Sequence, residues 1–165
     1  MGPVLAAVGA AIAALMEVTV ASRIHLADAQ PQIVLVVAVL LTLIIGFEEG
    51  MAWAFVGGLF VDLLAFRPIG STVFGLLIVV GLTAATSPFL ARVRFASPLV
   101  GVVVFTPVFI ILSSVTIGLL RPPAPHLHLS NIAAAMLVNV VFGALVAPLF
   151  IAVRRRWEQQ ERLSW

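Results

Sequence analysis

Residues 48–66 read EEGMAWAFVGGLFVDLLAF, an apolar run with two acids at its start and one acid, Asp62, near its end. A helix places Gly50, Ala54, Gly58 and Asp62 on one face, because they recur at intervals of four. Small residues at this spacing let helices pack closely inside a membrane. The acid on that face is expected to lie against protein, because a charge facing the bilayer centre costs at least about 2.5 kcal/mol.

Asp62 lies about one turn from the end of this predicted helix, where a charge costs less than at the bilayer centre. It is interpreted as hydrogen-bonded to helix-end groups or paired with nearby Arg67. The alternative is a role in partner contact or in conformational coupling. Gly57 sits beside the small-residue face and joins its members as a candidate for helix packing or partner contact.

The whole chain shares the apolar character of this segment. Of its 165 residues, 62% are hydrophobic and 10% are charged, whereas an ordinary soluble domain carries about 25% charged residues. A bilayer can absorb this much apolar surface, but a small globular core cannot. We therefore predict an all-α polytopic membrane helix bundle, one domain over residues 1–165. Its roughly six transmembrane helices are expected at 3–24, 31–45, 48–66, 71–90, 98–120 and 131–153.

The segment 31–45 is short for a span. At about 1.5 Å per residue it does not reach across a hydrocarbon core of roughly 30 Å. It is either a short crossing or a re-entrant segment, and the second alternative would leave five crossings.

Arginine placement predicts the orientation. With six crossings, the side of the C-terminus also holds the loop before residue 98. That side then carries Arg92, Arg94, Arg154, Arg155, Arg156 and Arg162, and the other side carries Arg23, Arg67 and Arg121. An excess of positive charge marks the cytoplasmic side, so both termini are expected in the cytoplasm. The tail 154–165 is then cytoplasmic, either amphipathic beside anionic headgroups or simply solvated.

No residue pattern indicates catalysis or a cofactor. The sequence has no Cys, which excludes thiolate chemistry and cysteine metal sites. His25, His126 and His128 fall in predicted loops, and loop polarity explains them more simply than a metal held across two loops. The pI of 11.1 does not indicate nucleic-acid binding, because the formal net charge is only +2. We predict a non-enzymatic protein without a metal, a cofactor or a nucleic-acid partner.

Two further polar residues, Glu17 and Asn139, fall inside predicted spans. Asn139 could donate a hydrogen bond to Glu17 or to Asp62. Both residues are interpreted as structural links between helices, in preference to a role as site residues. The predicted helix 3–24 also carries a second small-residue stripe, and this stripe predicts close packing inside the bundle or against another subunit. Its members are Ala6, Ala10 and Ala14.

The run GGLFVDLL at 57–64, followed by RPIG at 67–70, resembles the MreD family of bacterial rod shape-determining membrane proteins. That family typically shows a Gly-rich helix, an Asp followed by apolar residues, and a short turn with Pro, a hydrophobic residue and Gly. Length, helix count and a short basic C-terminus fit as well. The turn also has a physical reason, since Pro68 sets φ and Gly70 permits a positive φ before the next helix.

The resemblance implies a scaffold or regulatory subunit of the cell-elongation complex (elongasome) in the bacterial cytoplasmic membrane. This complex supports peptidoglycan synthesis and maintains cell shape. The implied partners are an MreC-like single-pass protein, an MreB-like filament, a RodA-like glycosyltransferase and a class B penicillin-binding transpeptidase. The small-residue stripe of the first helix, or a groove beside 48–66, is expected to receive the MreC-like membrane helix.

The resemblance also implies a fold similar to the substrate-binding membrane subunits of energy-coupling-factor vitamin transporters. That similarity gives the alternative function, a vitamin-binding transporter subunit. In such subunits an Ala-x-x-x-Ala pattern on the first helix docks on the coupling subunit, and Ala6, Ala10 and Ala14 match it. The predicted outer loops supply few polar or aromatic ligand side chains, with no Tyr and no Lys in the chain, which favours the scaffold.

Overall fold

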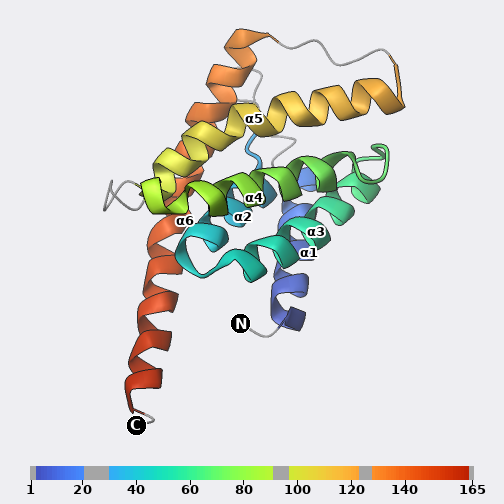
Figure 1. The fold of residues 1–165 in the computed structure, drawn as a ribbon. Coiled ribbons are helices and arrows are strands. Elements are labelled where there is room, and N and C mark those ends of the chain that lie inside the picture. Colours follow the sequence, from blue (N-terminus) through green and yellow to red (C-terminus); the bar gives the residue numbers. More distant parts are fainter. Residues whose placement is uncertain (1–2, 21–29, 91–96, 123–127, 164–165) are drawn as a thin grey trace.

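The computed structural model describes residues 3–20, 30–90, 97–122 and 128–163, and it places side chains within 7–20, 30–90, 98–122 and 128–154. The described part contains helices and no strand, which confirms the all-α prediction. The helices are α1 (Pro3–Thr19), α2 (Ile33–Ile44), α3 (Phe47–Leu64), α4 (Ser71–Leu90), α5 (Ser97–Leu120) and α6 (Leu129–Leu163) (Figure 1).

Each helix corresponds to one predicted segment, and the bounds of α4 are those predicted. Three bounds need correction. The first helix ends at Thr19, and the rest of its predicted range lies mostly outside the described residues. The second helix is shorter than predicted, with 12 residues. The predicted tail is a continuation of α6 to Leu163, because its Arg, Glu and Gln residues favour helix although they end the apolar run.

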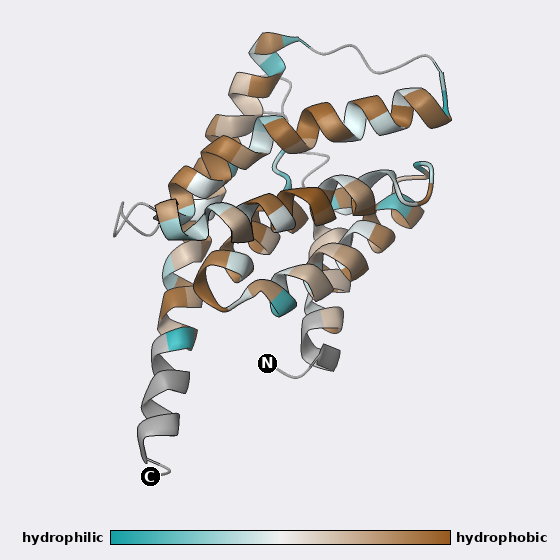
Figure 2. Ribbon diagram, in the orientation of Figure 1, coloured by the Kyte–Doolittle hydropathy of each residue, from teal (hydrophilic) through white to brown (hydrophobic). Residues whose placement is uncertain are grey.

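Among the described residues, three helices are long and apolar enough to cross a membrane: α4, α5 from Pro98, and the Leu129–Arg154 part of α6. Two shorter apolar helices accompany them, at Ala7–Thr19 and Ile33–Ile44. Figure 2 shows hydrophobic residues along most of the helical surface, with hydrophilic residues gathered toward helix ends and turns. This distribution indicates a membrane protein.

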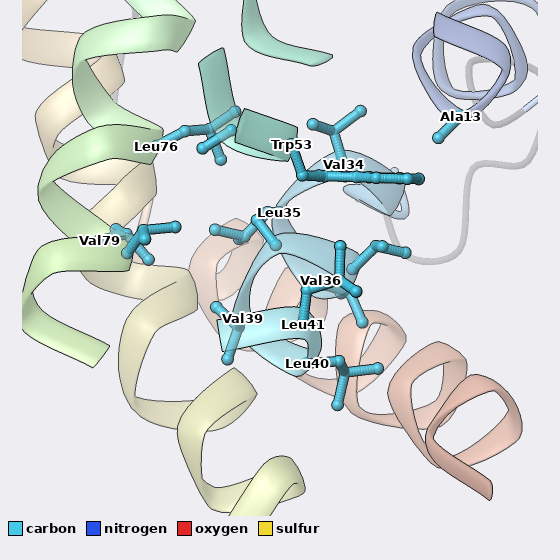
Figure 3. Close-up of a cluster of buried hydrophobic side chains, with 14 of the residues drawn as sticks. Ala13, Val34, Leu35, Val36, Val39, Leu40, Leu41, Trp53, Leu76 and Val79 are labelled. Carbon is cyan, nitrogen blue, oxygen red and sulfur yellow. The ribbon is translucent and has the colours of Figure 1, made fainter. Parts of the chain in front are cut away.

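The short helix α2 lies at the centre of the bundle and packs against every other helix. All of its residues from Val34 to Leu41 are buried. In Figure 3 Leu35 lies between Trp53 of α3 on one side and Leu76 and Val79 of α4 on another. A helix that is apolar on all faces requires this position, because neighbours must cover its whole circumference.

Close approach of the neighbouring helices depends on two adjacent glycines of α3. A Cβ at Gly57 would lie 2.6 Å from Cγ1 of Val34 in α2. A Cβ at Gly58 would lie 2.9 Å from Cα of Val73 in α4. A side-chain methyl can move aside, but a backbone atom of a packed helix cannot. Gly58 therefore sets the distance between α3 and α4.

We expect Gly58→Ala to lower the free energy of unfolding by about 1–3 kcal/mol, because the added methyl forces α3 away from α4. Titration of the purified protein with SDS in mixed micelles, followed by circular dichroism, measures this change. Gly81→Ala in α4 is the matched control, since a Cβ there meets nothing within 4 Å. Equal effects of the two substitutions would contradict the proposed close approach.

Candidate functional site

Asp62 is the centre of the hairpin formed by α3 and α4. Its carboxylate is fully buried. The Oδ2 atom accepts a hydrogen bond from the backbone N–H of Gly70 at 2.8 Å, and Oδ1 accepts from the Ser71 hydroxyl at 3.1 Å and the Thr72 N–H at 3.0 Å. These donors surround the start of α4, so Asp62 caps that helix at the positive end of its dipole. Of the two sequence-based interpretations of Asp62, this geometry supports hydrogen bonding to helix-end groups.

The turn that follows Asp62 has a fixed backbone. The Arg67 N–H donates to the Asp62 carbonyl at 3.0 Å, which is the six-to-one bond of a Schellman motif at the end of α3. Gly70 has φ of 95°, the positive value that the turn pattern predicts. Phe66 also has a positive φ, 53°, at a position of this motif where Gly is usual. Sequence reasoning missed Phe66, because nothing in its residue type favours that conformation.

A second carboxylate caps the central helix. Glu17 of α1 accepts with Oε2 from the backbone N–H of Val34 at 2.8 Å. Val34 belongs to the first turn of α2, where N–H groups have no partner within the helix. Glu17 and Asp62 both lie in apolar helices. Each of these two acids therefore caps the next helix along the chain.

Asn139 joins α6 to the start of α2 and to α5. Its Oδ1 accepts from the Gln32 backbone N–H at 2.9 Å, and its Nδ2 donates to Gln32 Oε1 at 3.1 Å and to Thr106 Oγ1 at 3.2 Å. The suggestion that Asn139 donates to Glu17 or Asp62 is therefore wrong, because Gln32 and Thr106 take its amide. No motif in the sequence distinguishes these two partners from other isolated polar residues.

A positively charged side chain lies at the C-terminal end of α2. Arg154 of α6 donates through Nη1 to the carbonyl of Ile44 at 2.9 Å. A guanidinium at a helix C-terminus complements the negative end of the dipole. The central helix is thus held at its start by Glu17 and at its end by Arg154, from two different neighbours.

The small-residue stripes lie within the bundle. Ala10 of α1 lies beside α3, where a Cβ built at Gly57 would be 3.7 Å from its methyl group. The buried small residues of the two stripes are Ala10, Ala14, Gly50, Ala54 and Gly58, and Gly57 beside the second stripe is buried as well. The side chain of Ala6 lies outside the described part. Of the two alternatives for the first stripe, the structure places Ala10 and Ala14 in packing inside the bundle, which leaves them no surface for a partner.

The described residues contain no group of three or more His, Cys, Asp or Glu side chains that could hold a metal ion. His128 is exposed beside the start of α6, and His25 and His126 lie outside the described residues. The carboxylates and the amide in the helices instead pair with backbone groups at helix ends. This arrangement stabilises a bundle and provides no nucleophile and base pair among these residues.

A chain whose described part is helical, with long apolar helices and with Glu17 and Asp62 capping neighbouring helices, is a helical membrane protein. Comparison with family models then gives the family: the chain matches the model described as rod shape-determining protein MreD over residues 2–152 and belongs to that family. Its role is therefore in rod shape determination. Searches of curated proteins and of solved structures gave no significant match.

We expect Asp62→Ala to lower the free energy of unfolding by at least about 2 kcal/mol, because several buried donors at the start of α4 lose their acceptor. Asp62→Asn keeps one acceptor oxygen, so its loss is smaller. The same SDS titration measures both changes. Glu48→Gln is the control, since Glu48 is exposed in the first turn of α3, and it should change stability by less than about 0.5 kcal/mol. An Asp62→Ala protein as stable as this control would contradict the cap.

A double-mutant cycle of Asn139→Ala and Thr106→Ala should give a coupling free energy of about 0.5–2 kcal/mol, as measured for hydrogen bonds between membrane helices. Unfolding titrations of the two single variants and the double variant supply this value. Asn131→Ala is the control on the same helix, because Asn131 is exposed. Asn131→Ala is combined with Thr106→Ala in a second cycle. If the coupling free energy of the Asn139 cycle is no larger than that of the Asn131 cycle, the link between α5 and α6 is ruled out.

Proposed function

We propose that the chain is a non-enzymatic scaffold or regulatory subunit of the bacterial cell-elongation complex, supporting peptidoglycan synthesis and cell shape. The family match over residues 2–152 carries this proposal, since it includes nearly all of the described helical bundle. The proposed partners are an MreC-like single-pass protein, an MreB-like filament, a RodA-like glycosyltransferase and a class B penicillin-binding transpeptidase.

The contacts that the polar residues make inside the bundle support a scaffold function. Asp62, Glu17 and Asn139 are engaged in capping and linking helices, so the described bundle presents mainly apolar helix faces to its surroundings. Two of these faces belong to α1 and α6. Their large exposed apolar residues include Val8, Ile12, Leu15 and Met16 on α1 and Leu137, Val141, Leu145 and Leu149 on α6. We propose that partner membrane helices bind these faces, rather than the buried Ala10 and Ala14.

In this proposal all six helices lie in the cytoplasmic membrane and both termini are cytoplasmic. The first turn of α1 and the last turns of α6 lie toward the same side of the bundle, which supports an even number of crossings (Figure 1). The arginine distribution supports the orientation. A short α2 can cross as an interior helix, because protein rather than lipid surrounds it. The likeness to energy-coupling-factor subunits stays a prediction from the sequence resemblance.

Depletion of the chain from its rod-shaped host should make the cells round, as measured by phase-contrast microscopy, and re-expression should restore rods. Purification in mild detergent should then recover the proposed wall-synthesis partners by mass spectrometry. Cells that remain rod-shaped after depletion would contradict the proposed function. Recovery of paired ATPases, or of a retained small molecule, would instead support the alternative of a vitamin transporter subunit.

Ile12→Ser tests the proposed α1 face, because Ile12 is exposed and its change leaves the core intact. We expect recovery of the single-pass partner to fall at least fivefold while the SDS unfolding curve stays unchanged. Leu82→Ser on α4 is the matched control, with an exposed leucine on another helix. Equal recovery with both variants would remove α1 from the proposed interface.

A further inference from the structure

The turn between α3 and α4 carries two large apolar side chains that the bundle leaves uncovered. Phe66 is 88% exposed and Ile69 is 69% exposed. Arg67, between them, is exposed as well. Internal packing therefore does not account for the two apolar side chains at these positions.

The backbone of Phe66 makes its residue type more unusual. A bulky residue at a φ of 53° is a steric outlier, and Gly is usual at this point of the motif. The conformation is imposed by its surroundings, because the Arg67 N–H bonds to the Asp62 carbonyl and the Asp62 carboxylate holds Gly70. Phe66 thus carries backbone strain without a gain from internal packing. A contact outside the bundle supplies a physical reason for its presence.

The position of the turn indicates what that contact is. The part of α4 that is long and apolar enough to span a membrane begins at Ser71, two residues after Ile69. The turn therefore lies at the edge of the apolar length of the helix, where hydrocarbon meets lipid headgroups. Apolar side chains gain free energy by entering this boundary, and an arginine beside them can reach the phosphates.

The C-terminal end of α5 has the same character. α5 runs antiparallel to α4, so its C-terminus lies at the same end as the α3–α4 turn, toward the right of Figure 1. Leu119 and Leu120, the last two residues of α5, are 79% and 58% exposed. Exposed apolar side chains on the α3–α4 turn and at the end of α5 favour an extended lipid boundary over one local protein pocket.

We propose that Phe66, Arg67 and Ile69 form a rigid lipid anchor. Phe66 and Ile69 insert at the boundary between acyl chains and headgroups of a phospholipid bilayer, and Arg67 binds lipid phosphate. The Asp62 hydrogen bonds keep the turn rigid, so this contact fixes the depth of the α3–α4 end in the membrane.

Site-directed spin labelling tests the anchor directly, since the chain has no Cys and single-cysteine variants need no background changes. Phe66→Cys and Ile69→Cys proteins are labelled with a nitroxide and placed in phosphatidylcholine–phosphatidylglycerol vesicles. We expect collision rates with oxygen at least twofold above those with a soluble nickel chelate. Leu82→Cys gives the reference within the span, and Glu48→Cys gives the aqueous reference.

Two results would overturn the proposal. Labels that prefer the nickel chelate would place the turn in water, and labels inaccessible to both reagents would place it against protein, either a partner or a second copy. A further measurement tests the effect on depth. A label at Phe74→Cys should move toward the aqueous phase when Phe66→Ser and Ile69→Ser are added, with an unchanged SDS unfolding curve. An unmoved label in that folded protein would show that the turn does not anchor the helix end.

Discussion

A backbone N–H or C=O group that lies away from water must find its partner inside the protein, and the fold depends on how α2 meets this requirement. With 12 residues, α2 reaches about 18 Å, whereas α4 with 20 residues reaches about 30 Å. Both ends of α2 therefore lie among neighbouring helices, and the unpaired N–H and C=O groups at these ends cannot all reach solvent. Glu17 and Arg154 supply the acceptor and the donor for those ends, so α1 and α6 are positioned by the helix they enclose.

The same requirement explains why the acids Glu17 and Asp62 occur in apolar helices, where they serve as helix caps. The start of a helix presents unpaired N–H groups and a partial positive charge, and a carboxylate satisfies both. Asp62 performs this role in α3 for α4, across a turn that follows it directly. The small residues serve a related purpose, because Gly58 lets α3 and α4 approach closely beside the bonds that Asp62 makes to the start of α4.

The sequence predicted features that depend on local pattern. The lengths of the apolar segments predicted the all-α class and the six helical segments. The spacing of four residues placed Gly58 and Asp62 on one helix face. Features that depend on contacts between distant segments could not be predicted, such as the bonds from Asn139 to Gln32 and Thr106. The last helix was predicted to end too early because its apolar run ends at Arg154, whereas residues of high helix propensity continue to Leu163. Phe66 was missed because its φ opposes the preference of its residue type.

These contacts separate two kinds of residue in a chain that belongs to the MreD family. Residues such as Asp62, Asn139 and Gly58 are expected to stabilise the bundle, so a loss of function on replacing them would not identify a contact surface. Exposed residues such as Ile12 on α1 and Phe66 on the turn add little to internal packing. The proposed scaffold uses such exposed apolar surfaces to meet other molecules. The proposed partner surface on α1 and the proposed lipid surface on the α3–α4 turn are both apolar, so they are distinguished by their position in the bundle and not by their hydropathy.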